Sequence, residues 1–389
     1  MMLTTEQLTA ARRLFPYTSS GRIYLNHAAT SPLSSRVVEA MTAHLRDRSE
    51  GKLDGYRDDI AMITRTRSAI CDLINGPSPD RISLQPNTSE ALNVVASGLQ
   101  WASGDQILLS EAEFPANVYP YLNLRRHGVE VDVIPSSRGV MTPEMIESRL
   151  TPRTRLLALS AVQFLSGYRA DLRTIGSICR SREVLFVVDA IQAVGAIPMD
   201  VQGDQIDAMA AGSHKWQMGP HGAGFLYLTE ELQSRIQQSS LSWLSVEEPW
   251  NFHDYEQPLA SSARRYEGGT PGVPSLWGMQ AALRTLLEYG METIQDQILG
   301  LTEILTTGLL QNGKLPVFSP PERENRAGIV TCALPEGADT RALMKQIESE
   351  GITLALREEK LRISPHFYNT PEEMERTLDT IHNCLQRGT

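Results

Sequence analysis

The sequence has few cysteines, and they lie far apart. Its four cysteines, Cys71, Cys179, Cys332 and Cys384, form no CxxC pair and show no spacing typical of a zinc site. A disulfide-stapled fold and a cysteine-ligated metal centre are therefore not expected, and no metal site is predicted. We interpret all four side chains as reduced thiols.

Long apolar runs and an excess of basic residues are also missing. No stretch approaches the roughly 18 apolar residues that a membrane helix needs, and the first residues lack the apolar core of a secretory signal. Lys plus Arg number 36 against 46 Asp plus Glu, a formal net charge of -10, which disfavours bulk binding to nucleic acid or anionic lipid. We therefore expect a cytoplasmic protein with neither nucleic acid nor membrane as a partner.

The sequence does contain enough ordinary globular material for more than one domain. Its 389 residues, 41% hydrophobic and 21% charged, exceed the roughly 150 residues of a typical domain. From residue 21 to about residue 270, short apolar runs alternate with amphipathic stretches, which is typical of an α/β domain with a mainly parallel sheet between helices. The predicted strands cover residues 82–84, 106–109, 129–134, 156–162, 184–188 and 225–228.

The pattern changes after the glycine-rich loop at 268–272. A long helical pattern over about 276–310 is followed by a smaller α+β segment. Its predicted elements are a strand over 329–334, a helix over 340–348, a strand over 352–356 and a final helix capped by Thr370 and Glu373. The predicted divisions are an N-terminal arm over 1–20 that packs with the small domain, a large domain over 21–275 and a small C-terminal domain over 276–389.

The strongest local signal is a single lysine among small residues. Lys215 follows Ser213 and His214 and precedes the glycine-rich segment 219–224, which leads into a predicted strand. A partly desolvated lysine beside glycine-rich backbone loses its proton readily and can form a Schiff base with an aldehyde. Because a lone loop lysine is more often simply solvated, this interpretation depends on the residues around it.

Two further features fit around that lysine. Asp189 follows the predicted buried strand 184–188, at the edge where open α/β sheets bind ligands. If it does not merely cap the next helix, it needs a cationic partner such as the protonated pyridine nitrogen of pyridoxal phosphate. The turn at 86–89 offers the hydroxyls of Thr88 and Ser89 and the free N–H groups of a helix start, which suit a phosphate but also occur in many plain helices.

The order of these motifs resembles the class V aminotransferase group of fold-type I pyridoxal phosphate enzymes. This group includes cysteine desulfurases, selenocysteine lyases, isopenicillin N epimerase and kynureninase. The likeness spans nearly the whole chain, and its motifs lie at 24–30, 87–90, 113–117, 189–192, 213–215, 266–271 and 361–370. It implies a large domain with a mainly parallel seven-stranded sheet, a smaller C-terminal α+β domain and pyridoxal phosphate as cofactor.

The resemblance also implies a role for each matching residue around the cofactor ring. Lys215 would form the Schiff base with the cofactor and move protons at the substrate's Cα. Asp189 would pair with the pyridine nitrogen, and Gln192 would hydrogen-bond the phenolic oxygen. Phe114 would stack on the ring, where many relatives carry a histidine; a phenyl ring cannot exchange protons as that histidine can.

Phosphate and substrate contacts are implied in the same way. The implied phosphate contacts are Thr88, Ser89, Ser213 and His214, with Thr270 reaching across from a partner subunit. That last contact implies a homodimer with shared active sites. Arg362 would bind the substrate's α-carboxylate through its guanidinium fork, although outside this motif it would read as a surface arginine on a strand. His27 and Gln163 are expected near the substrate, without an assigned role.

One departure from the family pattern bears on the reaction. Desulfurases attack sulfur with a cysteine on a loop shortly before the carboxylate-binding arginine, and residues 351–361 contain none. Cys332 reads as a buried core thiol. The sequence therefore favours β-elimination of a sulfur-containing amino acid without a catalytic cysteine. Transamination, racemisation or epimerisation, and kynureninase-like cleavage remain open, since all begin with proton removal from Cα.

Two other classes of protein fit the sequence less well. A dehydrogenase on a doubly wound sheet would need a GxGxxG motif after a strand, whereas the glycines at 219–224 precede one. A catalytically silent binding protein would not need Lys215, Asp189 and Arg362 to be intact.

Overall fold

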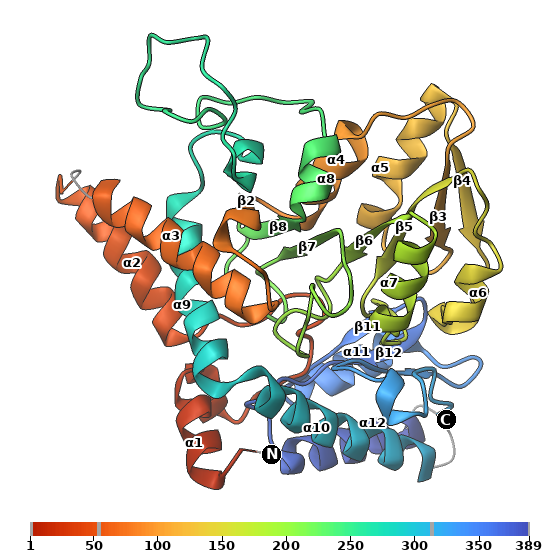
Figure 1. Cartoon of the computed structure of the whole chain (residues 1–389). Helices are drawn as coiled ribbons and strands as arrows, with labels where there is room; N and C mark the ends of the chain where they lie inside the picture. The colour runs from red at the N-terminus through yellow and green to blue at the C-terminus, as the bar shows by residue number, and fades with distance from the viewer. Residues whose placement is uncertain (1–2, 53–55, 312–314, 388–389) are drawn as a thin grey trace.

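A seven-stranded sheet forms the centre of the molecule (Figure 1). The computed structural model describes residues 3–52, 56–311 and 315–387. The strand order is β2-β8-β7-β6-β5-β3-β4, and all pairs are parallel except those that β8 forms with β2 and β7. The strands are β2 (Ile82–Gln85), β3 (Gln106–Ser110), β4 (Glu130–Ile134), β5 (Thr154–Ser160), β6 (Leu185–Asp189), β7 (Ala208–Gly212) and β8 (Gly224–Leu228). The predicted mainly parallel sheet is confirmed.

Both faces of this sheet are covered by helices, which explains the unbroken apolar runs in its strands. Leu157 and Phe186 belong to a core on one face, whereas Leu156 and Leu185 belong to a core on the other. The first core also contains residues of α3 (Tyr56–Leu73), α7 (Leu172–Ser181) and α9 (Val273–Tyr289), and the second contains residues of α4 (Thr88–Gly98), α5 (Tyr119–Leu122) and α8 (Glu230–Arg235).

Strand β7 is a central strand that was not among the predicted ones. Its sequence is Ala-Met-Ala-Ala-Gly, and all five residues are buried. Small side chains carry little strand propensity, so pairing with β6 and β8 decides the conformation here. A second correction concerns the long helical pattern over 276–310, because α9 ends at Tyr289, is followed by Gly290 with a φ of 79°, and gives way to α10 (Met291–Gln311).

The C-terminal domain has its own sheet and its own core (Figure 1). The three-stranded sheet has the order β11-β12-β9, and a separate pair joins β1 to β10. The elements are β1 (Ile23–Tyr24), β9 (Val330–Ala333), α11 (Thr340–Ser349), β10 (Ile352–Thr353), β11 (Ala355–Arg357), β12 (Lys360–Ile363) and α12 (Pro371–Arg387). The strand predicted over 352–356 is therefore two strands, since β10 pairs with β1 and β11 with β12.

Segments from the two ends of the chain contact each other. The remaining helices are α1 (Thr5–Arg13), α2 (Ser35–Ser49) and α6 (Pro143–Glu147). Arg12 of α1 forms an ion pair with Glu373 of α12 at 2.7 Å, and the Tyr17 hydroxyl donates to that of Tyr368 at 3.2 Å. Glu373 also completes the predicted capping box with Thr370, because each backbone N–H binds the other's side chain.

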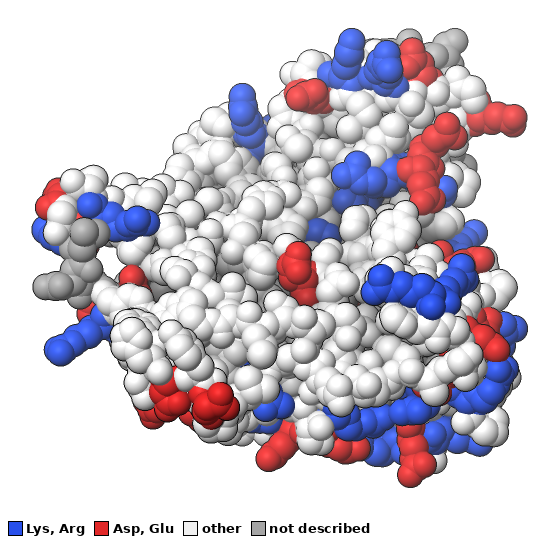
Figure 2. Space-filling view, turned by 90° about the horizontal axis from the view of Figure 1, so that it is seen from above, with Lys and Arg blue, Asp and Glu red and all other residues white. Residues whose placement is uncertain are grey.

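The surface shows no dominant sign of charge on the face seen from above. Lys and Arg alternate with Asp and Glu around its margin, and the central part is mostly uncharged (Figure 2). Within the described segments, no helix combines the length and the apolar character needed to cross a bilayer.

Candidate active site

Residues that follow five strands meet at one edge of the large sheet. Strands β2, β3, β5, β6 and β7 run in the same direction, so their carboxyl ends lie along that edge, where open α/β sheets bind ligands. The side chains that follow these ends are Thr88 after β2, Phe114 after β3, Gln163 after β5, Asp189 at the end of β6 and Lys215 after β7. The structure thus brings together most of the residues predicted from sequence.

Lys215 is mostly buried, and its amine faces a phenyl ring. Its Nζ lies 5.6 Å from the centre of the Phe114 ring. The pKa of Lys215 is lowered to about 8, chiefly by burial; the Asp189 carboxylate opposes this shift, and the positive charges of Arg362 and Arg357 add to it. A much larger fraction of this amine is therefore uncharged at neutral pH than for an ordinary lysine, as a Schiff base nucleophile requires.

Asp189 is a buried carboxylate with little internal compensation. It is 3% exposed, and its Oδ1 accepts a hydrogen bond from the Ile191 N–H at 3.0 Å. Burial raises the pKa of Asp189 to about 6, with a smaller contribution from the negative charge of Glu113. It forms no ion pair within the described part of the chain, so a cationic ring nitrogen is the partner that this carboxylate fits.

The Gln192 amide is held in one orientation by two neighbours. The Trp216 indole N–H donates to its Oε1 at 2.8 Å, and its Nε2 donates to the Ala28 carbonyl at 3.0 Å. An indole N–H only donates and a carbonyl only accepts, so the amide cannot be reversed without losing both bonds. One Nε2 hydrogen remains, and it suits an oxygen such as the cofactor's phenolic oxygen.

The start of α4 forms a cradle that fits an anion. The Thr88 hydroxyl is buried without a hydrogen-bond partner in the described chain, and Ser89 is exposed beside it. A Cβ on Gly212 would lie 3.2 Å from His214 Nδ1 and 3.4 Å from the Thr88 hydroxyl. Glycine therefore lets both side chains converge at a helix N-terminus, where a phosphate is favoured.

Ser213 and His214 differ in what they can offer that phosphate. The Ser213 hydroxyl already donates to the Pro220 carbonyl at 2.6 Å, so its single proton is engaged and the predicted phosphate contact is not available in this arrangement. His214 stacks on His221 at 4.8 Å between ring centres. Burial lowers the pKa of His214 to about 4, and the positive charges of Lys215 and His221 add to this effect, so its ring is neutral.

Arg362 reaches the same site from the C-terminal domain. It is 2% exposed, its Nη1 donates to the Phe164 carbonyl at 2.7 Å, and its Nε is buried without a partner in the described chain. The Phe164 ring lies 5.4 Å from that of Phe114, which faces Lys215. Burial, with the nearby charge of Arg357, lowers the pKa of Arg362 to about 10, so the group is still charged at neutral pH.

His27 has both ring nitrogens engaged within the chain, and its predicted position near the substrate stays a prediction. The ring is fully buried, with Nδ1 2.8 Å from the Ser364 carbonyl and Nε2 2.7 Å from the Tyr368 hydroxyl. Since a carbonyl only accepts, Nδ1 carries the proton and Nε2 accepts from Tyr368. Burial lowers the pKa of His27 well below its usual value, and the ring links the start of the chain to its end.

Gln163 and Glu113 form a buried network behind Phe114. The Gln163 amide donates to Glu113 Oε1 at 2.9 Å, and its own oxygen is buried without a partner in the described chain. Glu113 also accepts from the Ser160 hydroxyl and from Asn117. Burial raises the pKa of Glu113. Glu113 belongs to the motif at 113–117, but no local sequence pattern indicates that its carboxylate is buried in this network.

Thr270 lies apart from the residues at the sheet edge. It is exposed on the loop before α9 and lines a surface hollow with His44 and Asp47 of α2 and Asp59 of α3. Among the described residues, Thr270 has no interaction with the residues of the Thr88 cradle. Its predicted contact therefore requires a second subunit.

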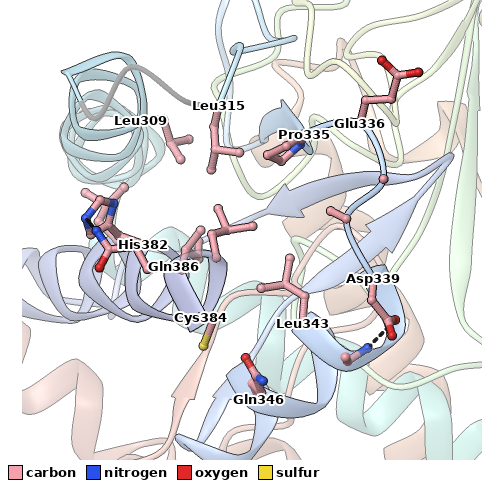
Figure 3. A pocket seen from close by; sticks show the side chains of 16 residues that line it. Leu309, Leu315, Pro335, Glu336, Asp339, Leu343, Gln346, His382, Cys384 and Gln386 are labelled. Carbon is pink, nitrogen blue, oxygen red and sulfur yellow. Dashed lines mark hydrogen bonds between the residues drawn. The ribbon is translucent and has the colours of Figure 1, made fainter. Parts of the chain in front are cut away.

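A separate cavity of about 200 Å³ lies within the C-terminal domain (Figure 3). Leu309, Leu343 and Cys384 point into it, and the Asp339 carboxylate at its rim accepts from the Ala342 N–H as the cap of α11. It offers no lysine or arginine, so it is not a candidate for the predicted chemistry. Among the described residues, no group of three or more His, Cys, Asp or Glu side chains is arranged to hold a metal ion.

Comparisons with known proteins agree with this arrangement. The family model described as aminotransferase class-V matches residues 23–376. The chain is 29% identical over 95% of its length to the uncharacterized aminotransferase YcbU of Bacillus subtilis, covering 96% of that protein. It is also 29% identical over 94% of its length to a probable cysteine desulfurase of Methanothermobacter thermautotrophicus, covering 95% of it.

A solved structure shows the same fold. The cystine C–S lyase C-DES, in complex with its reaction product cysteine persulfide, superimposes with a TM-score of 0.86 at 25% identity, over 94% of this chain and 98% of that one. The chain therefore belongs to the class V aminotransferase family and, as its motifs predict, is a pyridoxal phosphate-dependent enzyme.

Proposed function

We propose that this enzyme removes the Cα proton of a sulfur-containing amino acid and expels the sulfur group by β-elimination, without a catalytic cysteine. One observation carries the proposal: Lys215 and Arg362 face the same site, while all four cysteines lie in other parts of the fold.

The residues at the sheet edge fit the parts of pyridoxal phosphate. Asp189 would hold the ring nitrogen, Gln192 the phenolic oxygen and Phe114 the ring face. Phosphate contacts would come from Thr88, Ser89 and His214. When bound, the cofactor supplies an electron sink for the charge left when Cα loses its proton.

Lys215 supplies the acid–base chemistry at Cα. A buried amine with a pKa near neutrality accepts and returns a proton more readily than an ordinary lysine. Phe114 cannot take part in proton transfer, and His214 and His27 are neutral groups with lowered pKa values. Proton movement at Cα is therefore concentrated on the Lys215 amine.

Arg362 orients the substrate through its α-carboxylate. Its Nη1 is fixed by the Phe164 carbonyl, and its remaining N–H groups, including the unpartnered Nε, can form the parallel pair of bonds that a carboxylate accepts. Arg362 would thereby orient the Cα–H bond toward Lys215, whose amine lies 5.6 Å from the centre of the Phe114 ring.

The positions of the cysteines support elimination without a persulfide on the protein. The hairpin from β11 to β12 turns through Glu358 and Glu359 alone, so it has no loop that could present a thiol. Cys332 pairs with Leu361 on the face of its strand that packs in the C-terminal core, and burial raises the pKa of its thiol to about 12. The proton passes to Lys215, the Cβ–S bond breaks, and sulfur leaves with the electron pair. The likeness to a cystine C–S lyase supports the same reaction.

The test is a panel of amino acids incubated with the holoenzyme, with product and spectrum recorded for each. Pyruvate and a released sulfur compound are expected from sulfur-containing amino acids. A keto acid would indicate transamination, inverted stereochemistry an epimerase, and alanine a kynureninase-like cleavage; each would overturn the β-elimination proposal. A protein that stays colourless after addition of pyridoxal phosphate would indicate a silent binding protein.

We further propose a homodimer in which Thr270 contacts the phosphate in the partner's site. Its exposure in a surface hollow and its separation from the Thr88 cradle support this. Mixing Lys215→Ala subunits with Thr270→Ala subunits should restore activity, because one site of the mixed dimer then has both residues. If the mixture is no more active than its two components, Thr270 does not act across the interface.

A further inference from the structure

Three cationic side chains occupy one face of the sheet in the C-terminal domain. In the register of β11 and β12, Arg357 lies opposite Lys360, and Ala355 lies opposite Arg362. Side chains alternate along a strand and directly opposite residues share a face, so Arg357, Lys360 and Arg362 all point to the same side. The other side packs into the apolar core through Leu361.

The cationic face is turned toward Lys215. Arg362 donates to the Phe164 carbonyl, and the Phe164 ring contacts Phe114 beside Lys215. Arg357 is a diagonal neighbour of Arg362 on this face. In agreement with that position, the positive charge of Arg357 contributes to the lowered pKa of both Lys215 and Arg362.

A fourth cation joins this face from the large domain. The guanidinium carbon of Arg138 lies 5.5 Å from the centre of the Phe318 ring, and Lys360 Nζ lies 5.0 Å from the same centre. Arg138 has a φ of 56°, and the adjacent Gly139 would contact the Gln163 side chain at 3.0 Å if it carried a Cβ. The turn that carries Arg138 is thus packed against the site.

Among residues 3–52, 56–311 and 315–387, no carboxylate forms an ion pair with these cations, Arg138, Arg357, Lys360 and Arg362. The residues facing them on the sheet are Thr331, Ala333 and Ala355, which carry no charge. Arg357 donates to the Leu356 carbonyl and Lys360 to the Glu358 carbonyl, which leaves most of their donors available.

This arrangement is unfavourable for the protein alone. Like charges directly opposite each other on neighbouring strands destabilise a sheet. The turn between them holds Glu358 and Glu359 at φ of 46° and 60°, a conformation that glycine or asparagine adopts more easily. An anion bound between the cations would reduce the repulsion. The substrate's α-carboxylate would neutralise only Arg362 and leave the other cations without a counter-charge.

We propose that the substrate carries a second anionic group on its side chain, which Arg357 binds beside the α-carboxylate held by Arg362. Lys360 and Arg138 raise the positive potential at this end of the site. The preferred substrates are amino acids whose side chain ends in a carboxylate or an oxidised sulfur anion. The inference rests on the proposed function for the position of the substrate, but not on which reaction follows.

Two substrates of nearly equal size isolate the charge. The side chain of S-carboxymethylcysteine ends in a carboxylate, whereas that of S-carbamoylmethylcysteine ends in a neutral amide. β-Elimination of either compound yields pyruvate. For the wild-type holoenzyme we expect kcat/KM about tenfold higher for the carboxymethyl compound, the size of one charge-assisted hydrogen bond. Arg357→Ala should lose this preference, whereas Arg341→Ala, an exposed arginine on α11, should keep it.

Spectral titration of the bound cofactor gives the dissociation constants of both compounds independently of turnover. A Kd ratio near one in the wild type, or a preference unchanged in Arg357→Ala, would overturn the inference. Absence of pyruvate with a preserved, Arg357-dependent Kd ratio would instead overturn the β-elimination proposal alone. S-sulfocysteine, tested in the same way, distinguishes an oxidised sulfur anion from a carboxylate.

Discussion

The two sides of the site, which we call its walls, differ in the sign of the charges that they carry. The wall at the edge of the large sheet combines groups of both signs, with the Lys215 amine, the Asp189 carboxylate and a buried Glu113. The wall from the C-terminal sheet presents Arg357 and Arg362, with one sign of charge and no carboxylate on its face.

This difference fits the proposed positions of the cofactor and the substrate. A cofactor that has an aldehyde, a basic ring nitrogen and a phosphate needs an amine, an anion and a set of donors, and the large sheet provides each. A carboxylate-bearing substrate needs only cations, and the C-terminal sheet provides those. Substitutions at the large sheet should therefore affect the cofactor, and substitutions at the C-terminal sheet should affect the substrate.

The largest effect is expected from Lys215→Ala. In the proposed function the Lys215 amine both holds the cofactor covalently and transfers the proton at Cα, and the proton transfer by itself contributes about 10²–10⁴-fold to a rate. Turnover should fall below detection, and borohydride should no longer fix a chromophore to the protein. Lys345→Ala, an exposed lysine on α11, is the control and should retain both. Fixation of the chromophore in Lys215→Ala would place the Schiff base at another lysine.

Asp189→Asn is expected to have the next largest effect, again on the cofactor. Asp189 is the proposed partner of the cofactor's ring nitrogen, so loss of its buried charge should weaken cofactor binding and slow turnover by about 10²-fold. In the wild-type apoprotein the pKa of Asp189 is raised to about 6, so its negative charge is lost as pH falls through that value. Cofactor affinity measured by fluorescence titration should therefore decrease below about pH 6 in the wild type and stay flat in Asp189→Asn. The same decrease in both proteins would assign it to another group.

Arg362→Gln tests the other wall. Losing the charge-assisted pair should raise KM for an α-carboxylate substrate by about 10–100-fold, with a smaller change in kcat. Arg362→Lys keeps the positive charge but lacks the planar guanidinium fork, so its KM should lie between those of the wild type and Arg362→Gln. Cofactor affinity should be unchanged in both variants. Weaker cofactor binding would show that the two walls are not separable.

Local sequence patterns predicted the elements that carry several residues to the edge of the large sheet. The buried strand before Asp189 and the helix start after Asn87 are visible as an apolar run and a capping signal, and both place their residues at the sheet edge. Strand β7 was missed because its small side chains carry no strand signal. Its neighbours β6 and β8 determine it through pairing.

The remaining features depend on contacts between distant parts of the chain. His27 binds Ser364 and Tyr368, more than 330 positions away, so no local pattern could show that both ring nitrogens are used. The direction of Arg357 depends on a two-residue turn at Glu358 and Glu359, and glutamate at positive φ is not a turn signal. Sequence reasoning therefore predicted several residues that meet at the sheet edge, but not how their side chains are oriented.

Trp216→Phe should give the smallest effect, and it tests the orientation of the Gln192 amide at the edge of the large sheet. The variant removes the N–H that holds the Gln192 oxygen, so the amide can turn its oxygen toward the cofactor. Losing one hydrogen bond of this kind is expected to weaken cofactor binding about three- to tenfold and to shift the pKa of its visible absorption band. Trp101→Phe is a matched control, because it removes an indole hydrogen bond to the Ala96 carbonyl, away from the residues of the proposed site. If both variants shift the band equally, the effect reflects lost packing, and Gln192 does not depend on Trp216 for its orientation.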